Sequence, residues 1–434
     1  MKMGKFGGLL AAAGFVLLGQ VCSAAAADAP ADRGEYVARL ANCVACHSIP
    51  GAPAFSGGLK MATPLGAIYA TNITPDKTTG IGDYTFEDFD QAVRFGVAKD
   101  GHRLYPAMPY PSYAKASEED MRAMYDFFMK SVPAANVANK PSEIPSPLNI
   151  RWPIAIWNFV FANDDRYENV SGKDAAWNRG AYLVQGLGHC GACHTPRGLA
   201  FNEQGYDEDD GDFLVGAPLD NWSASNLRGD VNTGLGRWTQ GELEEFLKTG
   251  HNKSGTAFGT MTEVINNSTQ FMTDADITAM ATYLKAVPGS REGTTAPYAY
   301  DATTAKNLQA REFESTGALV YAQQCQSCHL MNGAGHAPYL PPLAGNPVTV
   351  DPSAASLINV VLNGSARVVV DGMPDAYKMP QYRVLLSDQE VADVVTFIRK
   401  GWGNKAEAVT AKEVADMRKL TDPASDQVNI LRMK

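Results

Sequence analysis

Cys43-Val44-Ala45-Cys46-His47 is the first of three copies of one pattern, in which two cysteines enclose two variable residues and a histidine follows. The other copies are Cys190-Gly191-Ala192-Cys193-His194 and Cys325-Gln326-Ser327-Cys328-His329. Two thiols at this spacing share one helical turn, where they can add to the two vinyl groups of one porphyrin. The histidine that follows then places an imidazole nitrogen under the iron. The pattern therefore predicts three covalently bound haems c.

Two other uses of a C-x-x-C pair fit this chain less well. A structural zinc site needs a second pair of ligands within a few tens of residues, whereas the copies here begin at residues 43, 190 and 325. A redox-active disulfide does not require the histidine. We therefore assign the motif residues to haem. The predicted thioether cysteines are Cys43, Cys46, Cys190, Cys193, Cys325 and Cys328, and the predicted proximal ligands are His47, His194 and His329.

The beginning of the chain predicts export. The first five residues include two lysines and no acidic residue, residues 6–18 are apolar, and small residues follow at 22–27. An apolar run this short is typical of a secretory signal peptide rather than of a membrane span. We expect cleavage near Ala27, with lipidation at Cys22 as the alternative. The mature protein is then expected on the periplasmic side of the bacterial cytoplasmic membrane.

Composition and charge bound the class of protein. The chain has 434 residues, enough for about three domains, and its 45% hydrophobic and 19% charged residues are typical of a globular protein with a real core. Once residues 1–27 are cleaved, every remaining cysteine belongs to a haem motif and none is left for a disulfide. Cleavage also removes two lysines, which takes the formal net charge from −10 to −12. Such a charge argues against nucleic acid and against anionic lipid as general partners.

One plan of helices surrounds each motif. A short amphipathic segment with an early glycine precedes the motif, and a middle helix and a final helix follow it. The final helices begin at Ser117, Thr273 and Ser387, each a hydroxyl N-cap with a carboxylate three residues later. No stretch of regular alternation predicts an extensive sheet. The predicted fold class is all-α, with three tandem class I cytochrome c domains and large haem-wrapping loops.

Proline and small residues gather between the repeats and set the predicted boundaries. The predicted parts are a signal peptide at 1–27, domain 1 at 28–140, an apolar linker at 141–170, domain 2 at 171–290, a linker at 291–312, domain 3 at 313–403 and a tail at 404–434. The apolar linker is too short and interrupted to span a bilayer. It either packs between domains or docks a partner or the membrane interface, where tryptophan is favoured. The tail either packs on the third domain or helps to hold a partner.

The ligand on the other face of each iron decides what the haem can do. A methionine thioether closes the site and raises the reduction potential, whereas an open position permits substrate chemistry. Met108, Met261 and Met379 each stand in the loop shortly before a final helix. Proline, glycine or aromatic residues surround all three, and such loops hold a ligand stiffly. We predict these methionines as the distal axial ligands.

Other methionines and histidines fit this position less well. They are Met61, Met272, Met373, His102, His189, His251 and His336. Met272 abuts an N-cap and is expected to face the core. His102, His251 and His336 would give bis-histidine haems of lower potential and are expected on polar loops, whereas His189 directly precedes Cys190 and can hardly reach the opposite face of the haem. In the third domain, residues 341–345 are expected to offer a backbone carbonyl to the Nδ1–H of His329.

Longer stretches carry a family resemblance. They include Gly34-Glu35-Tyr36-Val37-Ala38-Arg39, Leu104-Tyr105-Pro106-Ala107-Met108-Pro109-Tyr110 and Pro341-Pro342-Leu343-Ala344-Gly345-Asn346-Pro347. From 34 to 403 the chain resembles the triheme cytochrome c subunit of bacterial membrane-bound dehydrogenases, which serves quinoprotein alcohol dehydrogenase and flavin-dependent gluconate, sorbitol, fructose and glucose dehydrogenases. The resemblance implies Met108, Met261 and Met379 as axial ligands. It also implies a large catalytic subunit with PQQ or FAD, a small third subunit as a further partner, ubiquinone as the electron acceptor and association with the membrane surface.

Three haems on one chain can form a relay in which short hops replace one long jump. We therefore expect an electron-transfer subunit without catalytic residues, whose partner chooses the alcohol, sugar, polyol or sugar acid to be oxidised. The alternative is a soluble periplasmic carrier that serves a terminal oxidase, although one haem and a small charged docking face would suit that role better. A haem peroxidase would need an exchangeable iron position, and the three methionines argue against it.

Overall fold

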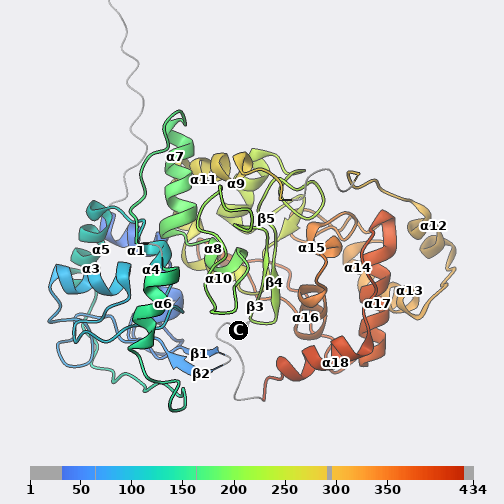
Figure 1. Cartoon of the computed structure of the whole chain (residues 1–434). Helices are drawn as coiled ribbons and strands as arrows, with labels where there is room; N and C mark the ends of the chain where they lie inside the picture. Colours follow the sequence, from blue (N-terminus) through green and yellow to red (C-terminus); the bar gives the residue numbers. More distant parts are fainter. Residues whose placement is uncertain (1–31, 64, 163, 291–295, 425–434) are drawn as a thin grey trace, which may run out of the picture.

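The computed structural model describes residues 32–63, 65–162, 164–290 and 296–424 of the chain. The expected signal peptide and Cys22 lie outside these residues. Within them, helices dominate, and the strands form separate two-stranded antiparallel hairpins rather than a larger sheet (Figure 1). The prediction of a helical protein is confirmed, with small hairpins added in the loops.

Helices and strands follow one another in a similar order three times along the chain. The first repeat has α1 (Arg33–Leu40), α2 (Cys43–His47), β1 (Lys60–Thr63), β2 (Gly66–Tyr69), α3 (Phe86–Phe95), α4 (Tyr110–Tyr113) and α5 (Glu118–Lys130). The second has α7 (Ala175–Ala181), the π-helical η1 (Tyr182–Leu187), α8 (Gly191–His194), β3 (Ala217–Leu219), β4 (Trp222–Ala224), α9 (Gln240–Thr249), β5 (His251–Asn252), β6 (Gly255–Thr256), α10 (Met261–Asn267), the 3₁₀ turn η2 (Thr269–Phe271) and α11 (Asp274–Ala286). The third has α13 (Thr316–Val320), the π-helical η3 (Tyr321–Cys325), α14 (Gln326–His329), α15 (Pro347–Val350), α16 (Ala355–Asn363), β7 (Val369–Val370), β8 (Met373–Pro374) and α17 (Asp388–Lys400). Outside the repeats lie α6 (Pro153–Phe161), α12 (Thr303–Ala310), the 3₁₀ turn η4 (Gly401–Gly403) and α18 (Ala411–Leu420).

In each repeat, the helix before the motif crosses the final helix at a glycine. A Cβ added to Gly34 would lie 2.2 Å from a backbone carbonyl oxygen of α5. The same addition at Gly180 would come within 2.0 Å of a carbonyl oxygen in α11, and at Gly317 within 2.2 Å of one in α17. Carbon and oxygen atoms that are not bonded to each other cannot approach so closely. The two helices of each pair therefore touch backbone to backbone, which requires a residue without a side chain.

The final helices begin at the predicted N-caps. The hydroxyls of Ser117, Thr273 and Ser387 each accept a hydrogen bond from the backbone N–H three residues later. Only Ser387 completes the capping box, because the Glu390 carboxylate returns to the Ser387 backbone. The corresponding carboxylates of the first two repeats, Asp120 and Asp276, bond to other partners instead.

These two carboxylates join the first repeat to the second. The Tyr36 hydroxyl donates to Asp276 (2.7 Å) and accepts from the N–H of the N-cap Thr273 (3.1 Å). Tyr182 does the same in the opposite direction, because its hydroxyl donates to Asp120 (2.6 Å) and accepts from the N–H of the N-cap of α5 (3.1 Å). The third repeat has Leu319 at the equivalent position, 40% exposed. The first two repeats thus form a reciprocal pair, from which the third is excluded.

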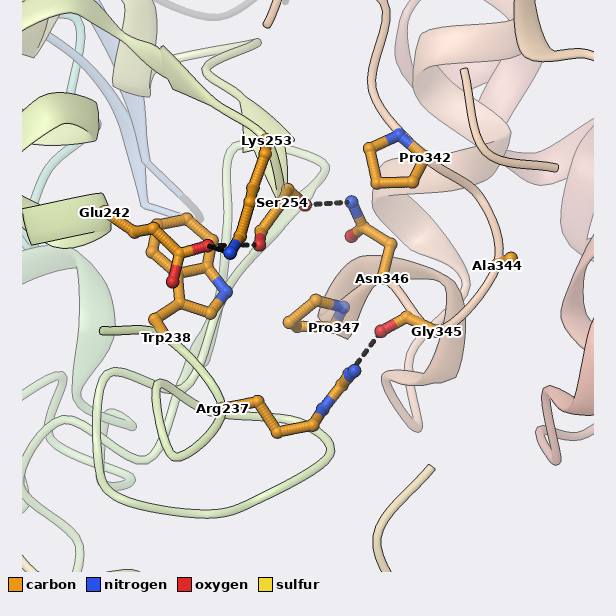
Figure 2. Close-up of a pocket in the computed structure, with 10 residues that line it drawn as sticks. All are labelled: Arg237, Trp238, Glu242, Lys253, Ser254, Pro342, Ala344, Gly345, Asn346 and Pro347. Carbon is orange, nitrogen blue, oxygen red and sulfur yellow. Dashed lines mark hydrogen bonds and ion pairs between the residues drawn. The ribbon is translucent and has the colours of Figure 1, made fainter. Parts of the chain in front are cut away.

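The buried side chains follow the same division. One hydrophobic cluster runs through the first two repeats, and a second cluster belongs to the third. Between the second and third repeats lie a small cluster of Ala257, Ile265 and Val368 and a cleft of about 260 Å³. Figure 2 shows that polar side chains of this cleft are already paired, with Asn346 donating to the Ser254 carbonyl at 3.0 Å. We conclude that polar contacts between the second and third repeats line this cleft.

The apolar linker and the tail differ in how far they are buried. None of the residues of α6 is fully buried, although Trp157 donates to the Ala200 carbonyl (2.7 Å) and Tyr110 donates to Asn158 (2.6 Å). The expectation that the linker packs between domains is therefore met by only part of this helix.

The tail helix α18 packs on the third repeat, where its Val414 is fully buried. Among the described residues no helix is long and apolar enough to cross a bilayer.

We predict that Gly34→Ala lowers the free energy of unfolding by about 2 kcal/mol or more, because the new methyl group would push α1 away from α5. The measurement is urea denaturation of the holoprotein. Gly241→Ala in α9 is the matched control, since nothing lies within 4 Å of its added Cβ, and it should leave stability unchanged or slightly raised. Equal losses in the two variants would contradict the helix contact described above.

Candidate functional site

Each of the three motifs lies on a single turn of helix, which brings its two cysteines and its histidine together. The turns are α2, α8 with its N-cap Cys190 and α14 with its N-cap Cys325, and none of the six cysteines is in a disulfide. Burial raises the pKa of the Cys43, Cys190 and Cys325 thiols to about 12. A structural zinc site needs four ligands, and the described residues hold no cluster of three or more metal-binding side chains. Within these residues, no second pair of zinc ligands therefore lies beside a motif.

Each motif histidine has its Nδ1 against a backbone carbonyl oxygen. The pairs are His47 with Thr71 (2.7 Å), His194 with Ser225 (2.6 Å) and His329 with Pro341 (3.1 Å). A carbonyl only accepts, so Nδ1 must carry the proton and Nε2 is left with its lone pair. Burial lowers the pKa of all three imidazoles, which favours the neutral form that binds a metal. The histidines are thus prepared as Nε2 ligands.

The sequence identified one of these three carbonyls in advance. The carbonyl predicted within residues 341–345 is that of Pro341, and the prediction is confirmed. The carbonyls of Thr71 and Ser225 were missed, although a signal existed, because Thr71-Asn72-Ile73 resembles Ser225-Asn226-Leu227. In both tripeptides the asparagine is buried and its side-chain oxygen accepts a backbone N–H two residues later, at 2.9 and 2.7 Å. The asparagine therefore fixes the turn that presents the carbonyl.

The three predicted distal methionines are half-buried, each against a hydrophobic cluster. Met108 packs on the cluster shared by the first two repeats, and Met379 on that of the third. Met261 packs on the small cluster between the second and third repeats, and it is the first residue of α10 rather than part of an irregular loop. Each precedes its final helix, as expected. Their bonds to iron remain predictions.

The alternative ligands have other environments. Met272 is 2% exposed and faces the core, as predicted, whereas Met373 is 74% exposed. His102 and His336 are exposed, and His251 contacts Asp375 and Tyr339 of the third repeat. His189 turns its Nδ1 to the Leu187 carbonyl at 3.0 Å. These contacts leave the three predicted methionines as the better candidates.

The donor set of each repeat therefore fits a haem c. It consists of two thiols on one helical turn for the vinyl groups, a neutral imidazole with a fixed tautomer, and a thioether held before the final helix. A haem with both axial positions filled by these side chains would exchange electrons and would have no position for a substrate.

Comparisons with known proteins agree with this chemistry. A family model described as cytochrome c matches residues 178–288 and 315–402, which contain the second and third motifs. The gluconate 2-dehydrogenase cytochrome c subunit of Pantoea cypripedii is 50% identical over 415 residues, which are 93% of this chain and 94% of the relative. The alcohol dehydrogenase (quinone) cytochrome c subunit of Gluconacetobacter polyoxogenes is 46% identical over 95% of this chain and 90% of its own. The fructose dehydrogenase cytochrome subunit of Gluconobacter japonicus is 35% identical over 89% of this chain and 82% of the relative.

We predict that each single replacement of Met108, Met261 or Met379 by alanine frees one axial position on one haem iron. Every variant should lose one third of the ferric charge-transfer absorption that requires an iron–methionine bond and should bind cyanide rapidly at one haem. Met272→Leu and Met373→Leu are the controls, because the first side chain faces the core and the second is exposed. Loss of the same signal in a control instead would contradict the ligand assignment.

Proposed function

We propose, since this chain belongs to the family of cytochrome c subunits of membrane-bound dehydrogenases, that it relays electrons from a catalytic subunit to ubiquinone. The catalytic subunit would carry PQQ or FAD and oxidise an alcohol, sugar, polyol or sugar acid, with a small third subunit in the complex. The identity over more than nine tenths of both the chain and the gluconate 2-dehydrogenase relative supports an assembly of this kind.

The observation that carries the proposal is the geometry of the three motif histidines. Each donates Nδ1–H to a carbonyl, which leaves Nε2 as a ligand beside a cysteine pair on the same helical turn. Because this arrangement occurs three times, we propose three covalent haems c. They would be bound by Cys43, Cys46, Cys190, Cys193, Cys325 and Cys328, with His47, Met108, His194, Met261, His329 and Met379 as axial ligands.

When bound, haem c supplies reversible one-electron exchange at its iron. The chain supplies the rest. Its cysteines hold the porphyrin covalently, its carbonyls fix the imidazoles, and its methionines close the sixth positions, so little has to move when an electron arrives or leaves. We propose three tandem class I cytochrome c domains, at 28–140, 171–290 and 313–403, which would place three such centres along one chain. This arrangement suits a subunit that conducts electrons and binds no substrate.

The proposal is tested on the native complex. We expect the mass of the mature chain to exceed that of residues 28–434 by three haems, a large PQQ- or FAD-containing polypeptide to co-purify, and substrate to reduce all three haems in the complex. Added ubiquinone should then reoxidise them. Fewer than three covalent haems, a five-coordinate high-spin haem or the absence of a catalytic partner would contradict the relay.

We further propose that the apolar face of α6 attaches the protein to the periplasmic surface of the membrane. Trp152 is 67% exposed and Phe159 is 91% exposed, with Ile156 and Val160 exposed beside them. A short helix with exposed tryptophan and phenylalanine is typical of a segment that lies in the interface of a bilayer. The net negative charge of the chain favours attachment by apolar burial over attraction to anionic lipid.

We predict that the double variant Trp152→Ser, Phe159→Ser binds phosphatidylcholine vesicles about tenfold or more weakly, because two large apolar side chains no longer enter the interface. Vesicle flotation measures the binding. Leu319→Ser is the control, since it removes an exposed apolar residue from the third repeat. Unchanged vesicle binding together with loss of the catalytic subunit would instead assign this face to the partner protein.

A further inference from the structure

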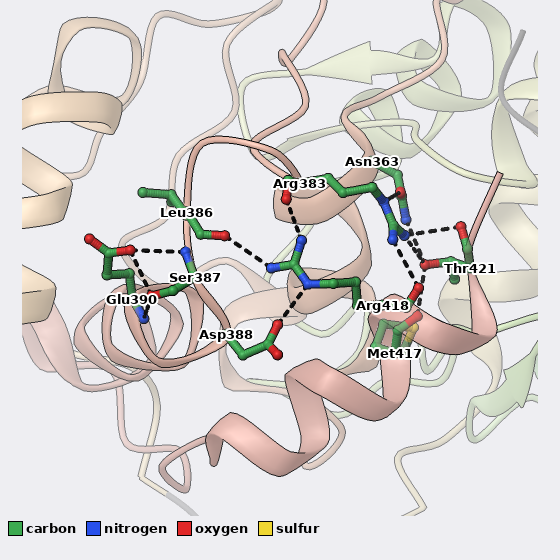
Figure 3. A network of polar contacts seen from close by, with 9 residues as sticks. All are labelled: Asn363, Arg383, Leu386, Ser387, Asp388, Glu390, Met417, Arg418 and Thr421. Carbon is green, nitrogen blue, oxygen red and sulfur yellow. Dashed lines mark hydrogen bonds and ion pairs between the residues drawn. The ribbon is translucent and has the colours of Figure 1, made fainter. Parts of the chain in front are cut away.

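The C-terminal helix α18 is tied to the segment that joins Met379 to the final helix α17 (Figure 3). The Arg418 guanidinium on α18 donates through Nε to Asp388 (2.7 Å) and through Nη2 to the Leu386 carbonyl (3.0 Å). Its Nη1 donates to the carbonyl of Arg383. One side chain of the tail thus holds the first residue of α17 and two points of the segment before it, which covers residues 380–387 and is called here the distal segment.

The distal segment grips the tail in return. Arg383 donates through Nη1 to the Arg418 carbonyl (2.8 Å) and through Nη2 to the Thr421 carbonyl (3.0 Å). Its Nε donates to Asn363 at the end of α16 (2.9 Å). Each arginine therefore bonds to the backbone carbonyl of the other. The carbonyls of Arg418 and Thr421 belong to the last turn of α18 and to its C-cap, where a cation is favoured by the helix dipole.

The other end of the distal segment is fixed within the third repeat. The Met379 N–H donates to the Ser365 hydroxyl (3.0 Å), and the Ser365 N–H donates to the Met379 carbonyl (3.1 Å). The Tyr382 hydroxyl donates to the Gln324 carbonyl (2.9 Å), directly before the motif cysteine Cys325. Between Tyr382 and α17 the side chains of Val384 and Leu385 are exposed. This exposed part is where the two arginines act.

We propose that Arg418 and Arg383 are positioning residues for the third haem, which keep Met379 on its iron by clamping the distal segment between α17 and α18. The inference rests on the proposed function, because it takes Met379 as an axial ligand. Without the clamp, the distal segment would open locally more often and the thioether would leave the iron more often. The tail helix thereby contributes to the redox potential of one haem while its residues touch none of the reacting atoms.

The clamp is specific to the third repeat, because the other two methionine segments are held by different parts of the chain. Beside Met108, Tyr110 bonds to Asn158 of α6. After Met261, Asn266 accepts the Val369 N–H at 2.8 Å, from a hairpin of the third repeat. A change in Arg418 should therefore alter one haem and leave the other two as internal references.

The test compares Arg418→Gln with Lys412→Gln in the full-length holoprotein. Lys412 lies on the same helix and pairs with Asp416, and its side chain is 83% exposed, so its loss removes an equal charge without touching the distal segment. In Arg418→Gln we expect cyanide to bind one ferric haem about tenfold faster, because the lost charge-assisted bonds make opening more frequent. One haem should also have a lower reduction potential and a weaker iron–methionine absorption band.

Arg383→Gln should reproduce the effect from the other side of the clamp, and Arg418→Lys should give a smaller effect because lysine cannot make the forked contacts. Circular dichroism reports whether α18 remains helical in each variant. Cyanide kinetics and a potential in Arg418→Gln equal to those of Lys412→Gln would overturn the clamp. A wild-type protein with no methionine ligand at the third haem would overturn both the clamp and the ligand assignment of the proposed function, and it would do so before any variant is made.

Discussion

The contact on which the rest of the structure depends is the crossing of two helices at a glycine. Gly34, Gly180 and Gly317 each allow the helix before a motif to touch the backbone of the final helix. The motif follows directly after the first helix of each pair, and the methionine segment comes directly before the second. Fixing the crossing therefore constrains both ends of the long loop that separates each motif from its predicted methionine ligand.

The same helix start serves two purposes in this protein. In the third repeat, Glu390 closes the capping box of its own helix. In the first two repeats, Asp120 and Asp276 accept hydrogen bonds from tyrosines of the opposite repeat instead, and Arg33 and Arg179 bond to the same carboxylates. An ion-paired carboxylate that also receives a buried hydroxyl is held firmly. This exchange makes the first two repeats a pair and leaves the third to be joined by other contacts.

Backbone carbonyls, rather than side chains, make many of the contacts that organise this protein. They accept hydrogen bonds from the histidines and from both arginines of the clamp, and they are the atoms that lie closest to the glycines at the helix crossings. A carbonyl has no residue identity, so its role leaves almost no trace in the amino-acid sequence. The asparagines at 72 and 226 are an exception, because each is needed to shape the turn that presents a carbonyl to a histidine.

Much of the candidate site could be predicted because its chemistry is local. The cysteine pairs with their histidines and the N-caps at Ser117, Thr273 and Ser387 involve residues at most four positions apart, and a helix brings such residues together in any fold. The methionines could be chosen by their distance from a helix start. Met261 obeys this spacing too, but it is the first residue of α10 rather than part of an irregular loop.

The sequence by itself determined the motifs, the helix starts and the family, since these depend on short spacings and on residue types. Only the tertiary structure decided that Tyr36 meets Asp276, that Thr71 and Ser225 orient histidines, and that Arg418 holds the segment after Met379. The physical reason is that these contacts join residues from different elements. Which of them meet depends on how whole helices pack, and no local pattern contains that information.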